Sequence, residues 1–258
     1  MTSLVKNSAL VTSNEMIAQD IYKLCLFCKD AFKEAKAGQF VNVYTDNACL
    51  LLPRPISICD STNDTLTLVF KVVGEGTKLF SGLKTGDRVD VSTSLGNSFD
   101  TSFLKEGDTV LLAGGGVGIP PMLNLAKKCK AEGLKTIAVL GFRDEPFLIE
   151  EFEKAGSEVH ICTDLGTFGF HGNVVQFLKS EGIAADAAFA CGPKIMLKFF
   201  TEYTKEKAIP TFISMEERMG CGYGACVGCA IDLNINGEVI RKKVCKDGPV
   251  FRAEEVIF

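Results

Sequence analysis

Four cysteines in the C-terminal part of the sequence have a spacing suited to an iron–sulfur cluster. Three share one glycine-rich loop in C-x4-C-x2-C spacing, and the fourth follows a gap that a short hairpin could fill. They are Cys221, Cys226, Cys229 and Cys245. This is the plant-type spacing for the ligands of a [2Fe–2S] cluster. Because glycine lets the backbone wrap closely around a small volume, the loop composition also suits a cluster.

A structural zinc site is the alternative for the same four cysteines, because four thiolates also bind Zn²⁺. Zinc sites usually bring two short cysteine pairs, each with two to four residues between its members. Here three cysteines crowd one loop and the fourth stands alone. The spacing therefore favours the cluster over zinc.

The chain has eleven cysteines, but they do not indicate a disulfide framework, which is typical of short secreted chains. Cys25 and Cys28 form a C-x-x-C pair in a predicted strand, where positions three apart point to opposite faces. We therefore expect the pair neither to share a metal nor to form a disulfide. The N-terminal stretch also lacks the apolar core of a signal peptide. Free thiols and an iron–sulfur loop both favour a reducing cytoplasm as the compartment.

Length and charge narrow the class of protein. A chain of 258 residues exceeds the usual size of one domain, so two or more domains are expected. The net charge of −4 and the lack of a basic run argue against a nucleic-acid partner. One uncharged run, Thr109–Ala126, approaches the length of a membrane span. It contains four glycines and two adjacent prolines, so we expect no membrane segment.

Residues 1–104 are predicted to form an antiparallel β-barrel with little helix. Short apolar runs alternate there with glycine, asparagine and aspartate turns, a pattern typical of a barrel or a sandwich. The expected strands are Ile21–Cys28, Gln39–Tyr44, Thr65–Val73 and Arg88–Ser92. This part of the chain is predicted as the first domain.

Two segments of this first domain suit the binding of a dinucleotide with a flat ring. Arg54-Pro55-Ile56-Ser57 places a guanidinium beside a rigid extended backbone and a hydroxyl group. Val69-Phe70-Lys71, followed by Gly74, Gly76 and Thr77, offers a cation and glycine amides at the end of a strand. An ordinary surface ion pair is the alternative for Arg54.

The order of these two segments resembles the flavin domain of the ferredoxin–NADP reductase superfamily. Its R-x-[YF]-[ST] and G-x-[GS]-[ST] motifs occupy the same relative places. The resemblance implies that FAD is held by Arg54, Pro55, Ile56, Ser57, Val69, Phe70, Lys71, Gly76 and Thr77. Ile56 departs from the first motif by replacing its aromatic residue. The resemblance therefore implies FAD binding, but it does not imply how the flavin ring is stacked.

Residues 105–215 are predicted to form a doubly wound α/β domain with a parallel five-stranded sheet. Five apolar strands alternate there with helical patterns such as Pro121–Glu132 and Lys194–Lys207. The expected strands are Thr109–Ala113, Thr136–Gly141, Glu158–Thr163, Ala187–Cys191 and Thr211–Met215. Residues 216–258 remain as a small [2Fe–2S] domain.

Two segments at the ends of these strands are candidates for binding NAD. A glycine turn precedes the first helix, where backbone amides can meet a pyrophosphate. Its glycines are Gly114, Gly115, Gly116 and Gly118. The turn is not the G-x-G-x-x-G fingerprint. Cys191-Gly192-Pro193 ends the fourth strand, at the sheet edge where ligands bind.

The superfamily resemblance implies that both segments hold the nicotinamide cofactor. Cys191 would then face the nicotinamide, and a buried core cysteine is the alternative. The third strand ends in Thr163–Gly166, with no basic residue for a 2′-phosphate, and Arg143 is flanked by two acidic residues. These features favour NAD over NADP. Neither histidine, His160 or His171, has an evident catalytic partner.

The chain as a whole resembles the electron-transfer subunits of NAD-dependent (class B) dihydroorotate dehydrogenases. The resemblance spans nearly the whole chain and is most specific in SMEERMGCGYGACVGC and KVCKDGPVF. It implies a heterotetramer in which two FMN-containing catalytic subunits oxidise dihydroorotate in pyrimidine biosynthesis. Two subunits like this one would carry the electrons to NAD⁺. Relatives tend to have tyrosine in place of Phe70, so a hydroxyl that could bond the flavin is absent.

The three predicted sites complement one another chemically. A nicotinamide exchanges electrons as a hydride pair, a [2Fe–2S] cluster passes them singly, and a flavin converts between the two. Because no acid–base constellation for a carbon substrate is evident, we expect a partner to supply that chemistry. The alternatives are a subunit of another complex, such as a ferredoxin-linked transhydrogenase, sulfide dehydrogenase or hydrogenase diaphorase, and a redox sensor. A sensor needs no hydride acceptor, which disfavours it.

Overall fold

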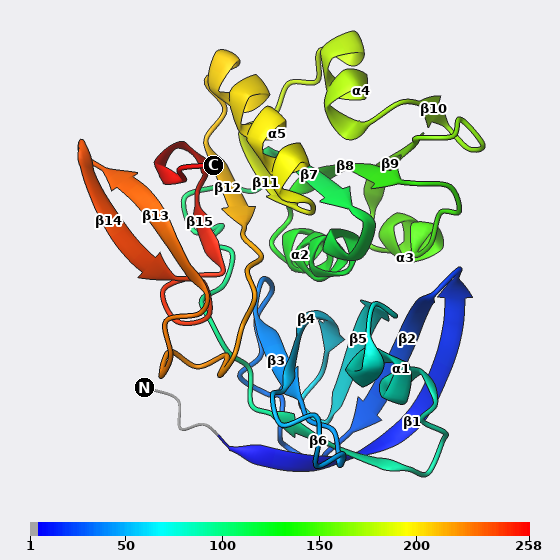
Figure 1. The fold of residues 1–258 in the computed structure, drawn as a ribbon. Coiled ribbons are helices and arrows are strands. Elements are labelled where there is room, and N and C mark those ends of the chain that lie inside the picture. Colours follow the sequence, from blue (N-terminus) through cyan, green and yellow to red (C-terminus); the bar gives the residue numbers. More distant parts are fainter. Residues whose placement is uncertain (1–4) are drawn as a thin grey trace.

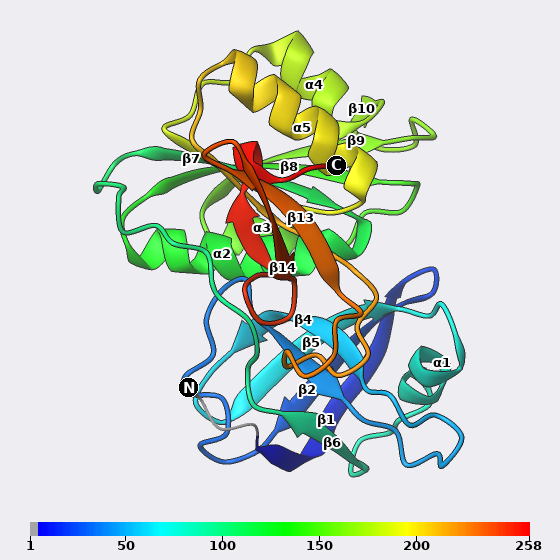
Figure 2. The same ribbon diagram turned by 60° about the vertical axis from the view of Figure 1, so that its left-hand side comes forward.

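The computed structural model describes residues 5–258 and divides them among a barrel, an α/β sheet and a C-terminal module (Figure 1). In both views the C-terminal module lies beside the barrel and the sheet (Figure 2). Among the described residues, no helix combines the length and apolarity that crossing a bilayer requires. The uncharged run Thr109–Ala126 instead forms a strand, a tight turn and most of a helix.

Six antiparallel strands close into the barrel in the order β1-β2-β5-β4-β3-β6, and β6 pairs back with β1. The elements are β1 (Lys6–Ala18), β2 (Ile21–Phe27), β3 (Phe40–Val43), β4 (Arg54–Ser61), β5 (Thr65–Lys71), α1 (Glu75–Ser81) and β6 (Arg88–Ser92). Alternate apolar residues fill the interior, as Leu66, Leu68 and Phe70 of β5 do. The predicted barrel is thus confirmed, although the sequence pattern missed β1, β4 as a full strand, and the helix α1.

A seven-stranded sheet forms the second part, in the order β10-β9-β8-β7-β11-β12-β15. Its strands are β7 (Thr109–Gly115), β8 (Lys135–Phe142), β9 (Ser157–Thr163), β10 (Phe170–His171), β11 (Ala187–Cys191), β12 (Thr211–Ser214) and β15 (Val250–Arg252). The five predicted parallel strands are present. Two short strands extend them, since β10 pairs parallel with β9 and β15 pairs antiparallel with β12.

Helices cover both faces of this sheet, so it is doubly wound as predicted. They are α2 (Ile119–Ala131), α3 (Ile149–Lys154), α4 (Val174–Glu181) and α5 (Lys194–Glu206), with short 3-10 turns η1 (Gly116–Gly118) and η2 (Ala253–Glu255). α2 and α3 lie on the face toward the barrel, and α4 and α5 on the other (Figure 1). Successive residues of β7 point to opposite faces of the sheet, so Leu112 packs in the core under α2 and Leu111 in the core under α5.

The barrel and the sheet are joined through α2, which packs on β4. Pro120 and Pro121 occupy the first turn of α2, where a missing N–H group costs nothing. The apolar face of α2 is buried against the sheet together with barrel residues such as Cys59 and Val69. Lys127 of α2 forms an ion pair with Asp60 at the rim of this contact. The flavin and nicotinamide segments therefore belong to one packed unit.

The C-terminal module is a hairpin with loops at both ends. Strands β13 (Ala230–Ile235) and β14 (Glu238–Lys243) fill the gap between Cys229 and Cys245, as the spacing predicted. The module then returns β15 to the edge of the large sheet. Residues 216–258 thus contribute one strand, β15, to the large sheet. The division into domains 1–104, 105–215 and 216–258 stays a prediction.

Candidate redox sites

The three cysteines of the cluster loop and Cys245 lie as two pairs. The backbone N–H of Cys226 donates to Cys221 Sγ at 3.4 Å, and the two thiols are also hydrogen-bonded. The Cys245 thiol is hydrogen-bonded to the Cys229 thiol in the same way. Two thiol pairs suit a [2Fe–2S] cluster, because four cysteines then serve two irons. Within residues 5–258, no three side chains of the His, Cys, Asp and Glu types surround one ion position.

The two pairs differ in their electrostatics. Burial acts to raise the pKa of Cys221, but backbone N–H groups of Cys226 and Tyr223 outweigh it and lower this pKa to about 6. Burial and the Cys229 thiol raise the pKa of Cys245 to about 12. Only a thiolate binds metal, so Cys221 is ready to bind at neutral pH. Cys245 would have to release its proton to ligate a cluster.

Exposure also separates the pairs. Cys229 and Cys245 are buried in the core of the module, whereas Cys221 and Cys226 are half-buried. Beside the half-buried pair, Cys221 and Cys226, the loop exposes an apolar side chain, since Val227 is 73% exposed. A single exposed apolar residue is ordinary on a protein surface, but here it borders the predicted cluster. A cluster held by these four cysteines would therefore lie near the surface on the side of Cys221 and Cys226.

Two side chains outside the loop hold it in place, and the sequence analysis missed both. Nδ2 of Asn42 in β3 donates to the Cys221 carbonyl at 2.9 Å. Nζ of Lys243, at the end of β14, donates to the Gly224 carbonyl at 2.7 Å. The only sequence signal for Asn42 was a polar residue inside an apolar strand. That signal does not identify its partner, which lies far away in the sequence.

Arg54 of β4 lies directly against the first turn of α1. A Cβ on Gly76 would overlap Nε of Arg54, so the guanidinium fills the space that a side chain would need. The Thr77 hydroxyl accepts hydrogen bonds from the N–H groups of Val73 at 3.0 Å and Gly74 at 3.2 Å, which shapes the turn. A guanidinium beside glycine amides is a suitable grip for a diphosphate. The two FAD segments predicted from the sequence therefore meet in space.

The remaining predicted FAD residues divide between two environments. Ile56 and Phe70 point into the barrel core, where Phe70 packs between the rings of Tyr22 and Phe80. Val69 is buried toward α2. Half-buried or exposed positions are Pro55, Ser57 and Lys71. Because Ile56 is a core residue here, its replacement of an aromatic residue bears on barrel packing before it bears on flavin stacking.

The two predicted NAD segments also come into contact. A Cβ on Gly118 would overlap the carbonyl of Cys191, and a Cβ on Gly115 would lie 2.7 Å from Met196 Sδ and 3.0 Å from Pro193 Cδ. Gly114 pairs with Cys191 between β7 and β11. The strand order reverses between these strands, and ligands bind outside the carboxyl ends at such a switch point.

The remaining glycines of this edge differ in what surrounds them. Gly116 has a φ of +53° and open space where a Cβ would be, so its backbone is accessible to a ligand. Gly192 packs against Met196 and Gly115. The Cys191 thiol is hydrogen-bonded to the side chain of Ser214, and burial raises the pKa of Cys191 to about 12. The thiol is therefore protonated at any ordinary pH.

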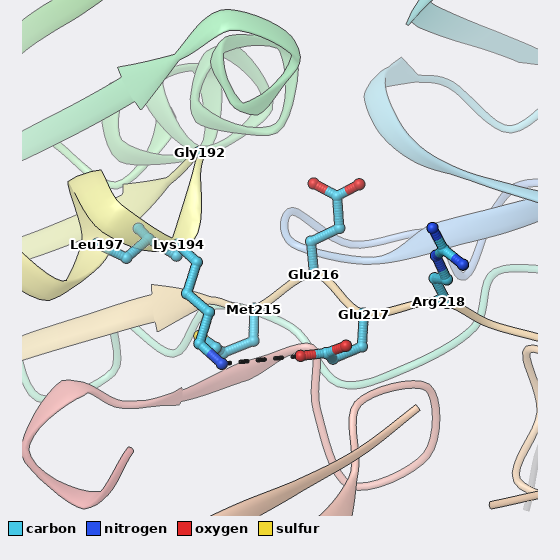
Figure 3. A pocket seen from close by; sticks show the side chains of 7 residues that line it. All are labelled: Gly192, Lys194, Leu197, Met215, Glu216, Glu217 and Arg218. Atoms are coloured by element: carbon cyan, nitrogen blue, oxygen red, sulfur yellow. Dashed lines mark ion pairs between the residues drawn. The ribbon is translucent and has the colours of Figure 1, made fainter. Parts of the chain in front are cut away.

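A pocket of about 310 Å³ opens beside this edge of the sheet (Figure 3). It is lined by Gly192, Lys194, Leu197, Met215, Glu216, Glu217 and Arg218. Lys194 and Glu217 form an ion pair of 4.0 Å across it, while Glu216 points away from Lys194 (Figure 3). The segment Met215–Arg218 leads directly into the cluster loop. One stretch of chain thus connects the predicted nicotinamide edge with the predicted cluster.

At the far end of the predicted NAD site, the exposed Arg143 follows β8 and precedes two acidic residues. The loop after β8 contains Asp144, which accepts a hydrogen bond from Thr167 at 2.7 Å. Of the two histidines, His160 pairs with Glu158 at 2.9 Å and packs against Phe177. His171 ends the edge strand β10. Neither histidine lies in a site described above.

Comparison with known proteins first gives the class. A solved NADH-dependent reduced ferredoxin–NADP oxidoreductase superposes with a TM-score of 0.86 and 31% identity, covering 97% of this chain and 90% of that one. A flavohemoglobin from Malassezia yamatoensis, determined with bound FAD and heme, has a TM-score of 0.70 at 21% identity, covering 81% and 59% of the two chains, and shows the fold alone. The fold and the paired thiols define a ferredoxin–NADP reductase-type oxidoreductase with an iron–sulfur module.

The family follows from closer relatives. Residues 216–257 match the model for the iron–sulfur cluster binding domain of dihydroorotate dehydrogenase B. The dihydroorotate dehydrogenase B (NAD(+)) electron transfer subunit of Geobacillus thermodenitrificans is 39% identical, with 96% of each chain covered. The same subunit from Caldanaerobacter subterraneus is 41% identical, with 98% and 99% covered. The chain belongs to this family of electron transfer subunits, as the sequence resemblance predicted.

Proposed function

We propose that this chain passes electrons from a catalytic dihydroorotate dehydrogenase subunit to NAD⁺ through a [2Fe–2S] cluster and FAD. The observation that carries the proposal is the placement of two thiol pairs against the barrel, beside the segment Met215–Arg218 that leads from the nicotinamide edge. In this order the cluster would supply single electrons, FAD would store two, and NAD⁺ would leave with a hydride. Pyrimidine biosynthesis is the process served.

The chain's own residues divide this work. Cys221, Cys226, Cys229 and Cys245 would ligate the cluster. Arg54 and the glycine amides around Gly76 would hold the FAD diphosphate, and Pro55, Ser57 and Lys71 would complete the flavin site. The glycine turn Gly114–Gly118 with Cys191–Pro193 would hold NAD. The Cys191 thiol is protonated and hydrogen-bonded to Ser214, so its role is to shape the site rather than to exchange a proton.

A partner subunit follows from the proposed role. The relatives of this chain are named as electron transfer subunits, which implies a separate catalytic subunit. We propose an FMN-containing catalytic subunit, in a heterotetramer with two copies of each chain. The eleven cysteines, all free thiols, suit a cytoplasmic location, where thiols stay reduced.

The test is to purify the chain anaerobically with an FMN-containing dihydroorotate dehydrogenase subunit. Dihydroorotate-dependent reduction of NAD⁺ is then measured for the complex and for each subunit alone. We expect activity only in the complex. NADH should also bleach the flavin absorption of the isolated chain. An inactive complex whose electron-transfer chain still reacts with NADH would refute the partner and leave the redox sites standing.

A second function has one specific observation in its favour. The NADH-dependent reduced ferredoxin–NADP oxidoreductase matches 97% of this chain, so a similar chain can serve a different complex. In that case the partner would bring ferredoxin and NADP chemistry in place of dihydroorotate. Reduction of the flavin by dihydroorotate in the presence of the catalytic subunit separates the two. Only the first function predicts it.

A further inference from the structure

A buried amide connects the barrel to the cluster loop. Asn42 in β3 has no exposed surface, and its Nδ2 donates to the Cys221 carbonyl at 2.9 Å. Its Oδ1 has no hydrogen-bond partner among the described residues. A buried acceptor without a partner costs stability, so barrel stability alone does not explain an asparagine at this position. The side chain points at the cluster loop, and only its Nδ2 group forms a hydrogen bond there.

The amide also shapes the residue that follows the first cysteine. A Cβ on Gly222 would overlap Oδ1 of Asn42, so the amide lies flat against the glycine backbone. Gly222 has a φ of +76°, which a residue with a side chain rarely adopts. Contact and conformation therefore fix the loop at the same point. The position of the Cys221 backbone is set from the barrel.

The backbone of Asn42 is fixed by its neighbours in the barrel. Its backbone N–H donates to Ser92 Oγ at 2.9 Å, and the Ser92 hydroxyl donates to the Thr93 carbonyl at 2.7 Å. On its other side Asn42 pairs with Pro55 between β3 and β4. Pro55 belongs to the segment proposed to lie along the flavin. A single residue therefore contacts the cluster loop and is in register with the flavin segment.

We propose that Asn42 is a positioning residue for the cluster. It fixes Cys221, and with it the iron that the Cys221–Cys226 pair would hold, at a set place relative to the flavin segment. Its amide is also an outer-shell dipole that adjusts the reduction potential of the cluster, because such groups tune the metal they surround. The inference rests on the proposed function, in which the cluster and FAD exchange electrons.

Two substitutions of Asn42 separate these effects. Asn42→Leu keeps the branching of the side chain in a larger volume and removes the donor, whereas Asn42→Asp removes the donor and adds negative charge. The full chain is prepared anaerobically with FAD and cluster, and its electron paramagnetic resonance spectrum and cluster midpoint potential are measured. We expect altered g values in both variants and a more negative potential in Asn42→Asp. Cluster reduction by NADH should slow by about 5- to 150-fold, the factor that corresponds to leaving one buried group unpaired.

Asn97 provides the matched control. Its Nδ2 donates to the carbonyls of Val250 at 2.8 Å and Asp247 at 3.2 Å, so it fastens the module to the loop after the barrel without touching a cluster cysteine. Asn97→Ala should lower the melting temperature and leave the spectrum and potential unchanged. If Asn42 variants fail to hold a cluster, Ser92→Ala is the milder test, with a smaller shift of the potential expected.

The outcomes are distinct. Unchanged spectra and potentials in Asn42 variants that retain the cluster, or an unchanged potential in Ser92→Ala where they do not, would refute the proposal. An equal shift in Asn97→Ala would also refute it, because general loosening of the module would then be the cause. A wild-type chain whose flavin is not reduced by NADH would instead refute the proposed function. NADH reduction of FAD should be the same in all variants.

Discussion

The cluster loop and the nicotinamide edge are built in different ways. Three of the four cluster cysteines stand within nine residues, and a local hairpin returns the fourth. The nicotinamide edge instead brings Gly118 against Cys191, two residues that belong to different strand–helix connections. The ligands of a site built within one segment stay together, but a site assembled from two strands depends on the register of those strands. Substitutions should therefore affect one site without the other.

Cys226→Ser should have the largest effect and should be confined to the cluster. Cys226 supplies both a thiol and the N–H group that lowers the pKa of Cys221, although serine keeps that N–H group. Losing one of four ligands should abolish the cluster signal and reduce NAD⁺ reduction by the complex to that of the catalytic subunit alone. NADH reduction of FAD should persist. The measurements are iron content, the resonance spectrum and stopped-flow flavin bleaching.

The control for this change is Cys49→Ser, because Cys49 is an exposed free cysteine outside the three sites. It should behave as the wild type in every assay. Undiminished NAD⁺ reduction by a Cys226→Ser complex without a cluster would contradict the electron path. It would show that FAD receives electrons from the partner directly.

Gly118→Ala should disturb the nicotinamide edge and leave the cluster intact. The added Cβ would overlap the Cys191 carbonyl, and a backbone group cannot move aside as a flexible side chain can. Overpacking of this kind costs about 1–3 kcal/mol. We expect weaker NADH binding by about 5- to 150-fold, since each 1.4 kcal/mol is a factor of ten. Titration of flavin bleaching with NADH measures it, and an unchanged affinity would contradict the proposed NAD site.

Gly76→Ala should weaken FAD binding by a comparable factor, although its neighbour is the flexible end of Arg54 and not backbone. The guanidinium can move, at the expense of a charge-assisted hydrogen bond worth about 1.5–3 kcal/mol. FAD should bind about 10- to 150-fold more weakly, as measured by fluorescence titration of the apoprotein. Gly82→Ala, at the other end of α1, meets only ordinary contacts and serves as the control. Equal FAD affinities in the two variants would show that Arg54 does not bind the FAD diphosphate.

Sequence patterns predicted local features better than contacts between distant segments. The cysteine spacing predicted the hairpin between Cys229 and Cys245, and it is present. Periodicity and turn residues predicted the five parallel strands and the barrel, which are also present. The pattern missed β1, whose long mixture of polar and apolar residues shows no clear alternation. It also missed β15 and the bond from Asn42 to Cys221, because both join parts of the chain that are far apart in sequence. Pairing of this kind is decided by packing, not by local preference.

The smallest expected effect is that of Cys191→Ala, which should leave the pH dependence of hydride transfer unchanged. Burial raises the pKa of Cys191 to about 12, so the thiol is protonated between pH 6 and 9 and should give the reaction no pH dependence there. An unfolded thiol has a pKa of about 8.5, so the stability due to this shift is complete below that pH and is lost as the pH rises toward 12. The free energy of unfolding of Cys191→Ala should therefore fall less steeply as the pH rises, as measured by denaturant titration at several pH values.

Cys129 in α2 is the control for this last change, because burial raises its pKa to about 12 as well but it lies in the core, away from the nicotinamide edge. Cys129→Ala should reduce the alkaline loss of stability in the same direction. Neither variant should alter the pH profile of flavin reduction by NADH. An alkaline limb of that profile that disappears in Cys191→Ala and persists in Cys129→Ala would give Cys191 a chemical role. The nicotinamide edge would then depend on a titrating thiol.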